Sequence, residues 1–219
     1  MIRIFINNMR WTLIIVAITA FIGPVMGQVE VTDDFKKIAA NYSSESMNMK
    51  FKYSYYYDIN VATPNKVLNG EMAQKGNLYY YRLDKTEVMR SSDYIVMVDK
   101  KGRNLMLDTI ISGANKASNM NIPIDSLMQF YGDVEVEKIG NLKRYKLYSP
   151  IEGISHTLMT VNEQSWTITK IEVFFFENRP GRDKESIRNK LIINYYDYQS
   201  PCKKPTSFFN VEKYIKISG

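Results

Sequence analysis

The 219-residue sequence contains a single cysteine and a single histidine. Cys202 has no partner for an internal disulfide, so a secreted form of this chain depends on its apolar core for stability. One cysteine and one histidine are also too few ligands for a structural zinc site. Cys202 stands between Pro201 and Pro205 in an expected loop. We interpret it as an inert thiol, with an intermolecular bridge or a redox role as the alternative.

The sequence also lacks the motifs of common catalytic centres. No serine lies in a Gly-x-Ser-x-Gly elbow, which leaves a Ser-His-Asp triad without support. No glycine-rich phosphate loop occurs. His156 shares one face of an expected strand with Leu158 and Thr160, and we interpret it as a half-buried strand residue, with a catalytic base as the alternative. We therefore expect no enzymatic activity, no cofactor and no metal.

Paired carboxylates are present in two places. Asp33 and Asp34 are adjacent, and Glu135 and Glu137 share one face of an expected strand. The strand pair has a spacing that suits cation binding or glycosidic chemistry. We interpret both pairs as solvated surface.

One long apolar run occurs, at residues 11–22, and it lies near the N-terminus. Arg3 and Arg10 precede it without any acidic residue, and residues 23–27 provide a helix breaker and small residues. About a dozen apolar residues are too few to span a bilayer comfortably, but they suit a secretory leader. We expect a signal peptide at residues 1–27 that directs the protein to the periplasm, with an uncleaved membrane anchor as the alternative.

Residues 28–219 are expected to form a single domain of about 190 residues. The formal net charge of +6 falls to +4 when the leader, with its two arginines and no acid, is removed. The basic residues are scattered rather than clustered, which argues against nucleic acid as a partner. A mild attraction to an anionic membrane surface remains consistent with this charge.

Alternation of apolar and polar residues dominates the domain. In residues 47–55 every second side chain is apolar. This two-residue period is typical of a strand in a sheet that has one face exposed to solvent. Short turns separate the strands, which makes sequential strands antiparallel neighbours. The expected strands are Met47–Tyr57, Val67–Lys75, Leu78–Leu83, Glu87–Arg90, Tyr94–Asp99, Asn104–Asp108, Val134–Ile139, Leu142–Tyr148, Ser155–Val161, Trp166–Phe176 and Lys190–Tyr198.

Helical spacing appears in two short segments. Thr32 or Asp33 is the expected N-cap of the first, and a second is expected to start near Asp125. The tail Phe208–Ile217 is compatible with an edge strand or a short helix. The inward-facing residues expected on the two helices are Phe35, Ile38, Ala39, Tyr42, Leu127, Met128 and Tyr131.

These elements predict a mainly β protein with short helices. About ten antiparallel strands cannot leave their apolar face in water, so the sheet has to curl or be covered. We expect a strongly curved antiparallel sheet, an open or half barrel, with helices lidding its concave face.

Apolar side chains that adapt to irregular shapes are abundant, with 16 tyrosines, 10 phenylalanines and 12 methionines. They are compatible with the wall of a cavity for a flexible hydrophobic ligand. On composition alone we favour the alternative, an ordinary β core that contains aromatic cross-strand pairs.

The order of these elements resembles the periplasmic lipoprotein-carrier family, the LolA/LolB-like proteins. An N-terminal helix leads into a long alternating strand, then a Gly-containing strand, an aromatic strand and a closing pair of long strands. The segments that carry the resemblance are residues 35–42, 49–57, 68–72, 78–81, 94–107, 168–171 and 191–195.

The resemblance implies a single LolA-like half-barrel domain at residues 28–219. It implies a non-catalytic periplasmic carrier that binds the acyl chains of a lipoprotein or lipid in a hydrophobic cavity and works with an inner- or outer-membrane partner protein. The expected ligand-binding residues are Phe51, Tyr53, Tyr55, Met72, Tyr79 and Tyr81 on the wall, with Leu127 and Met128 on the lid.

Two positions depart from the family pattern. Lys75-Gly76 stands where carriers of this type have an Arg-Pro pair, and Asp99-Lys100-Lys101-Gly102 stands where they have Asp-Gly. The missing Arg-Pro pair favours an alternative: an envelope adaptor or assembly module of the same fold that binds a protein partner rather than lipid.

Overall fold

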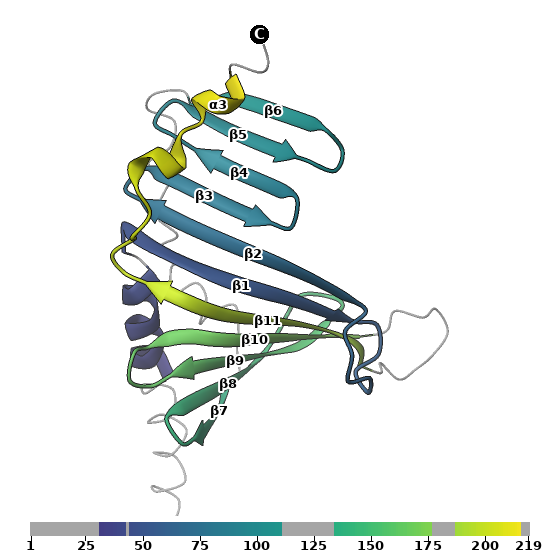
Figure 1. Cartoon of the computed structure of the whole chain (residues 1–219). Coiled ribbons are helices and arrows are strands. Elements are labelled where there is room, and N and C mark those ends of the chain that lie inside the picture. Colours follow the sequence, from purple (N-terminus) through teal and green to yellow (C-terminus); the bar gives the residue numbers. More distant parts are fainter. Residues whose placement is uncertain (1–30, 43, 111–133, 177–186, 216–219) are drawn as a thin grey trace, which may run out of the picture.

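The computed structural model describes residues 31–42, 44–110, 134–176 and 187–215. Eleven strands form one antiparallel sheet (Figure 1). The expected leader and the expected second helix with Leu127 and Met128 lie outside the described residues. The strands are β1 Ser46–Tyr56, β2 Lys66–Lys75, β3 Leu78–Leu83, β4 Thr86–Arg90, β5 Tyr94–Asp99, β6 Asn104–Thr109, β7 Val134–Ile139, β8 Leu142–Tyr148, β9 Ile154–Asn162, β10 Thr167–Phe176 and β11 Ile187–Gln199.

The sheet consists of two antiparallel meanders joined side by side. Strands β1–β6 form the first and β7–β11 the second, and β1 pairs with β11 at the junction. The order across the sheet is therefore β6-β5-β4-β3-β2-β1-β11-β10-β9-β8-β7. The sheet does not close, because β6 and β7 lie at its two ends. The predicted open, curved antiparallel sheet is confirmed.

The predicted strand boundaries differ from the observed ones by at most three residues, and one of these differences is informative. Trp166 was expected to begin a strand, but its φ of 52° places it in a left-handed turn, and β10 begins at Thr167. Glycine adopts the same left-handed conformation in the turns after β2 and β7, where Gly76 and Gly140 have φ of 59° and 61°. Residues without a Cβ adopt this conformation at little cost.

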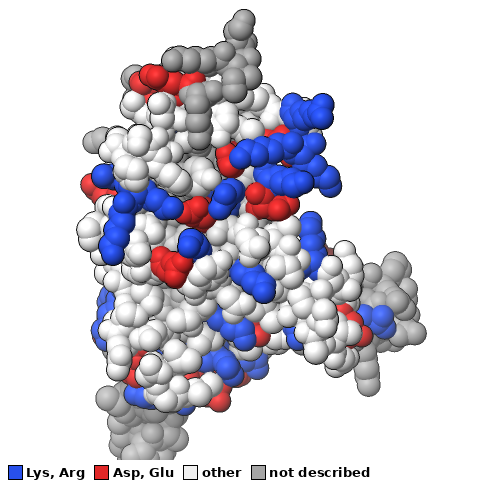
Figure 2. Space-filling model, viewed as in Figure 1, with Lys and Arg blue, Asp and Glu red and all other residues white. Residues whose placement is uncertain are grey.

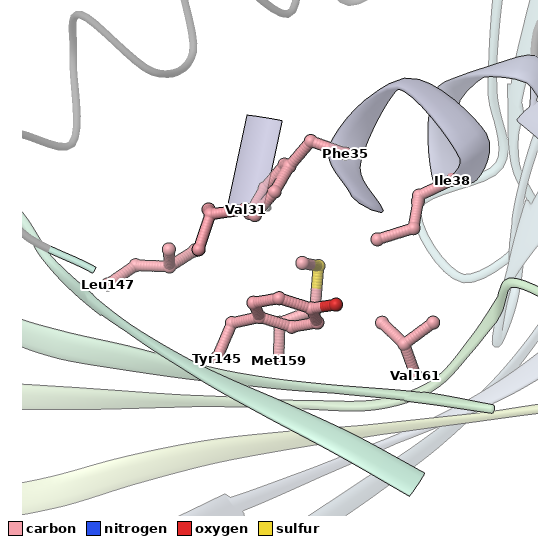
Figure 3. Packing of buried hydrophobic residues seen from close by; sticks show 7 residues of the cluster. All are labelled: Val31, Phe35, Ile38, Tyr145, Leu147, Met159 and Val161. Carbon is pink, nitrogen blue, oxygen red and sulfur yellow. The ribbon is translucent and has the colours of Figure 1, made fainter. Parts of the chain in front are cut away.

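The N-terminal helix, residues 31–42, packs against the second meander. Because the helix already includes residues 31–33, the prediction of Thr32 or Asp33 as its N-cap is wrong. One face of the helix carries apolar residues at helical spacing and meets inward-facing residues of β8 and β9 (Figure 3). The buried cluster comprises Val31, Phe35, Ile38, Tyr145, Leu147, Met159 and Val161.

A buried ion pair attaches the N-terminal helix to β8. Asp34 was expected to be solvated, but it is only 2% exposed, because the helix turns it toward β8. Lys143 Nζ lies 2.8 Å from Asp34 Oδ2, and the Tyr145 hydroxyl donates to the same oxygen at 2.8 Å. Both partners are themselves buried. These charge-assisted hydrogen bonds offset the cost of removing Asp34 and Lys143 from water. They form only when the helix keeps its position on β8.

Directly paired residues of an antiparallel sheet lie on the same face, so the register assigns each side chain to a face. We call the face that carries Phe51, Met72 and Tyr81 the helix face. Tyr42 and Ile171 contact both this core and the core under the N-terminal helix, so the helix covers the same face. We call the opposite face, which carries Ala73 and Tyr80, the tail face.

The C-terminal tail covers the first meander on the tail face. It contains a 3₁₀ helix η1, Thr206–Phe209, and a short helix α3, Glu212–Ile215, so it is helical rather than an edge strand. Phe209 and Val211 are buried against Ala73, Tyr80, Met89 and Val96. Cys202 is buried in the same cluster, which agrees with an inert thiol.

Two buried carboxylates of the sheet hold this tail. Glu71 pairs with Lys204 of the tail and with Arg82 of β3. Glu87 accepts a hydrogen bond from the Tyr214 hydroxyl at 2.5 Å. The two ends of the described chain therefore cover opposite faces, each attached to the sheet by a buried acidic side chain.

Candidate functional site

The expected wall residues lie on the helix face, around the centre of the sheet. Phe51 and Met72 are buried, with 2% and 7% of their surfaces exposed. The Phe51 ring stacks on Tyr81 at a centroid distance of 5.6 Å and meets Tyr53 edge-on at 5.4 Å. Met72 is paired directly with Met49 and with Tyr81. These two residues form the floor of the site rather than its exposed lining.

The four tyrosines of the expected wall are half-buried. Tyr53, Tyr79 and Tyr81 pack against the same buried cluster as Phe51. Tyr55 lies farther along β1, where its ring contacts Tyr57 edge-on at 5.1 Å. Three of the four are therefore brought together, and Tyr55 lies toward the hairpin between β1 and β2.

Burial makes the hydroxyls of Tyr79 and Tyr81 weaker acids. It raises the pKa of Tyr79, and it raises the pKa of Tyr81, where the nearby Tyr53 hydroxyl adds to the effect. Tyr195 of β11, which sequence reasoning did not select, packs beside Phe51, and burial raises its pKa too. All three remain neutral hydrogen-bond donors at neutral pH.

A continuous apolar line runs from this floor to one edge of the sheet. Each of strands β1–β6 contributes one residue, and each is paired directly with the next. We call this line the apolar stripe. Its residues, in order, are Met49, Met72, Tyr81, Val88, Met97 and Met106.

Exposure increases along the apolar stripe. Met49 is 3% exposed, Met97 is 41% exposed and Met106 is 67% exposed. Sequence reasoning missed the outer half, because residues 94–99 are apolar at nearly every position and do not indicate which face each side chain occupies. Only the register with β4 and β6 places Met97 in line with Val88 and Met106.

A cationic side chain borders the stripe. Arg90 is paired with Tyr79 on one side and with Ile95 on the other, so it lies on the helix face. Among the described residues its Nε is buried without a hydrogen-bond partner. A guanidinium in such surroundings is suited to an anionic oxygen at the polar end of an apolar ligand.

The remaining candidates for chemistry are satisfied locally. The His156 ring stacks on Phe174 at 4.4 Å, and Ser155 Oγ lies 3.0 Å from its Nδ1. Burial, reinforced by Lys146, lowers the pKa of His156. Glu135 is paired with Lys146 and accepts a hydrogen bond from Tyr148. Within the described residues no three His, Cys, Asp or Glu side chains are grouped for a metal ion.

Surface charge is mixed, with a local excess of positive charge. Lys and Arg side chains gather where the hairpins of β3–β6 turn (Figure 2). Lys85, Lys100, Lys101 and Arg103 lie in these turns and are exposed. In the part of the chain that the structure describes, no helix is long and apolar enough to cross a membrane.

Comparisons with known proteins identify similar folds among solved structures. Neither a known protein family nor a characterised sequence matches the chain. A LolA superfamily protein from Nitrosomonas europaea is 11% identical over 81% of this chain and 98% of its own, with a TM-score of 0.34. An outer membrane lipoprotein-sorting protein domain from Vibrio parahaemolyticus is 9% identical over 83% of this chain and 97% of its own, with a TM-score of 0.37.

A third similar structure is the MucA/MucB complex of Pseudomonas aeruginosa. It is 8% identical over 83% of this chain and 61% of the matched chain, with a TM-score of 0.47. The structures found thus include the superfamily that the sequence resembles. Since the TM-scores of these three structures are below 0.5, we base the function on the residues of this chain.

Proposed function

We propose that this protein is a non-catalytic carrier of acyl chains in the cell envelope, and that the chains lie along the apolar stripe. The observation that supports this proposal is the gradient of exposure from Met72 to Met106 on the helix face. Methionine and aromatic side chains adapt to flexible ligands of varied shape. The leader expected at residues 1–27 would deliver the protein to the periplasm.

The energetics suit reversible transport. Burial of about ten methylenes at about 0.8 kcal/mol each amounts to about 8 kcal/mol, which corresponds to micromolar binding before ordering costs. A carrier has to release its cargo, so tighter binding would be a disadvantage. The neutral tyrosine hydroxyls and Arg90 would supply polar contacts for the head of the ligand beside the middle of the stripe.

Met97 is the best position for a test, because it is exposed and lies on the stripe. We expect Met97→Asp to weaken the uptake of a fluorescent fatty acid about tenfold or more, since a buried carboxylate opposes burial of an acyl chain. Val67 provides the matched control. It is 42% exposed, against 41% for Met97, but its pairing with Ser54 places it on the tail face.

The two variants are compared by titration of the fluorescent fatty acid, with thermal unfolding as the check of folding. The proposal requires saturable uptake by the wild-type protein, a large loss in Met97→Asp and no loss in Val67→Asp. Equal effects of the two substitutions would place the ligand elsewhere. Absence of saturable uptake by folded wild-type protein would contradict the proposal.

The second candidate is an adaptor of the same fold that binds a protein partner. It is favoured by the burial of Phe51 and Met72, whose surroundings are filled by the protein's own tyrosines and leucines. In this case the exposed outer part of the stripe would contact the partner. Loss of partner binding in Met97→Asp, together with no fatty-acid uptake by the wild type, would favour the adaptor.

A further inference from the structure

The two edges of the open sheet differ sharply in chemistry. Strand β7 carries Glu135, Glu137 and Lys138, charges of the kind that protect an edge from pairing with another strand. Strand β6 instead has Leu105, Met106 and Leu107 at its centre. Met106 and Leu107 are 67% and 40% exposed. An exposed apolar edge strand is a template for pairing with another chain.

The main-chain groups available at the β6 edge follow from its pairing with β5. Ile110 N donates to Asp93 O at 2.8 Å, so alternate residues from Ile110 backward direct their main-chain groups toward β5. Met106 belongs to this set. Leu105 and Leu107 therefore direct their N–H and C=O groups outward, away from the sheet.

We propose that β6 pairs antiparallel with β6 of a second copy of this chain, about a two-fold axis at Met106. In this register Leu105 of one copy faces Leu107 of the other, and these are the residues whose main-chain groups point outward. About four main-chain hydrogen bonds form between them. The side chains match as well, because Leu faces Leu, Met faces Met, and Asn104 faces Asp108.

The sequence of β6 singles out a second copy as the occupant, because Leu-Met-Leu is symmetric about Met106. The corresponding arrangement on β7 would fail. A two-fold axis at Val136 places Glu135 of one copy opposite Glu137 of the other, and like charges directly opposite destabilise a strand pair. The apolar stripes of the two copies would meet at Met106 and form one continuous line across both sheets.

The dimer is expected to be weak. A single strand pair buries less than a standard interface, so a dissociation constant on the order of 10–100 µM is expected. Pairing does not require a bound lipid, and therefore the test is carried out on purified protein without lipid. Its outcome is independent of whether the protein carries acyl chains.

Disulfide trapping tests the register directly. Paired residues that do not exchange hydrogen bonds have Cα atoms about 4.5 Å apart, within the range that a disulfide accepts. We expect Met106→Cys to form a covalent dimer on mild oxidation, in a background where Cys202 is replaced by Ser. Val136→Cys, on the other edge at 44% exposure, is the matched control and should remain monomeric.

Sedimentation equilibrium supplies the second measurement, without any cysteine. The wild-type protein should show a mass that increases with concentration, and Leu107→Lys should remain a monomer with unchanged thermal stability. A wild-type protein that stays monomeric to several hundred micromolar would overturn the proposal. Equal trapping through Met106→Cys and Val136→Cys would also overturn it, because random collision would then explain the product.

Discussion

The ring of Phe51 lies directly over Gly70 on the neighbouring strand. The two residues are paired between β1 and β2, and a Cβ atom at position 70 would lie 1.8 Å from Phe51 Cε2. The ring therefore occupies the space of a missing side chain. Tyr81 stacks on the same ring, so a side chain at position 70 would disturb the aromatic group as well.

Replacement of Gly70 by alanine should therefore destabilise the protein. The Phe51 ring is 2% exposed and has no open space to enter, so we expect a loss of about 1–3 kcal/mol in the free energy of unfolding. Urea unfolding measures it. Asn69→Ala, at the adjacent exposed position, should change stability by less than about 0.5 kcal/mol.

A double-mutant cycle separates this contact from a general effect of alanine in a strand. In a Phe51→Leu background the smaller side chain leaves room, so Gly70→Ala should cost less there than in the wild type. An equal cost in both backgrounds would show that the ring does not account for the glycine.

The adjacent aspartates of the N-terminal helix should behave very differently. Asp34→Asn removes the nearer counter-ion of the buried Lys143 and leaves Glu163 at 3.8 Å, so we expect a loss of about 3 kcal/mol in the free energy of unfolding. Asp33 pairs with Lys36 on the surface, where both side chains are more than half exposed. Asp33→Asn should leave the free energy of unfolding, measured by chemical denaturation, nearly unchanged. Similar effects of the two substitutions would contradict the buried network.

Stability should depend on pH through His156. Burial against Phe174 lowers its pKa below the ordinary value of 6.5, so the unfolded chain binds the proton more readily than the folded protein. The stabilisation is fully present above pH 6.5 and is lost as the pH falls toward the lowered pKa. His156→Gln should remove this dependence between about pH 7.5 and 5.5.

Urea midpoints at several pH values, for wild type and variant, provide the measurement. The lowered pKa values of Glu135 and Glu163 act below their ordinary value of 4.5, outside this window. A wild-type profile parallel to that of His156→Gln across the window would show that the ring titrates alike in both states.

The C-terminal tail should detach when its contact with Glu87 is lost. The Tyr214 hydroxyl donates to a carboxylate that is only 5% exposed, so Tyr214→Phe leaves part of this acceptor unsatisfied. We expect faster proteolytic cleavage in the tail. Tyr57→Phe, at a residue 62% exposed, should cleave at the wild-type rate. Unchanged cleavage in Tyr214→Phe would assign the anchoring to the burial of Phe209 and Val211 and to the pair of Lys204 with Glu71.

Alternation of side chains predicts most of the sheet, because strands that are consecutive in sequence pair with each other throughout β1–β6 and throughout β7–β11. Short turns leave only antiparallel meanders, and strands such as Leu78–Leu83 and Tyr94–Asp99 are predicted to the residue. The pairing of β1 with β11 joins residues far apart in the chain. Neither periodicity nor turn signals predict this pairing, which only the structure shows.

The site was harder to predict for a physical reason. A two-residue period identifies the two faces of a strand, but not which face is covered by the helix or by the tail. Asp34 illustrates the difficulty, since its neighbour Asp33 is solvated and only the packing of the helix on β8 buries the second carboxylate. Met97 and Met106 are likewise assigned to the apolar stripe only by the register across β4–β6.

Native mass spectrometry of the protein, isolated from its own envelope without detergent, tests the proposed carrier most directly. The account predicts a population with the added mass of a lipid or acylated peptide, removable by organic extraction and reduced in Met97→Asp but not in Val67→Asp. A single apo mass for the folded wild type, with no uptake of added fatty acid, would contradict it.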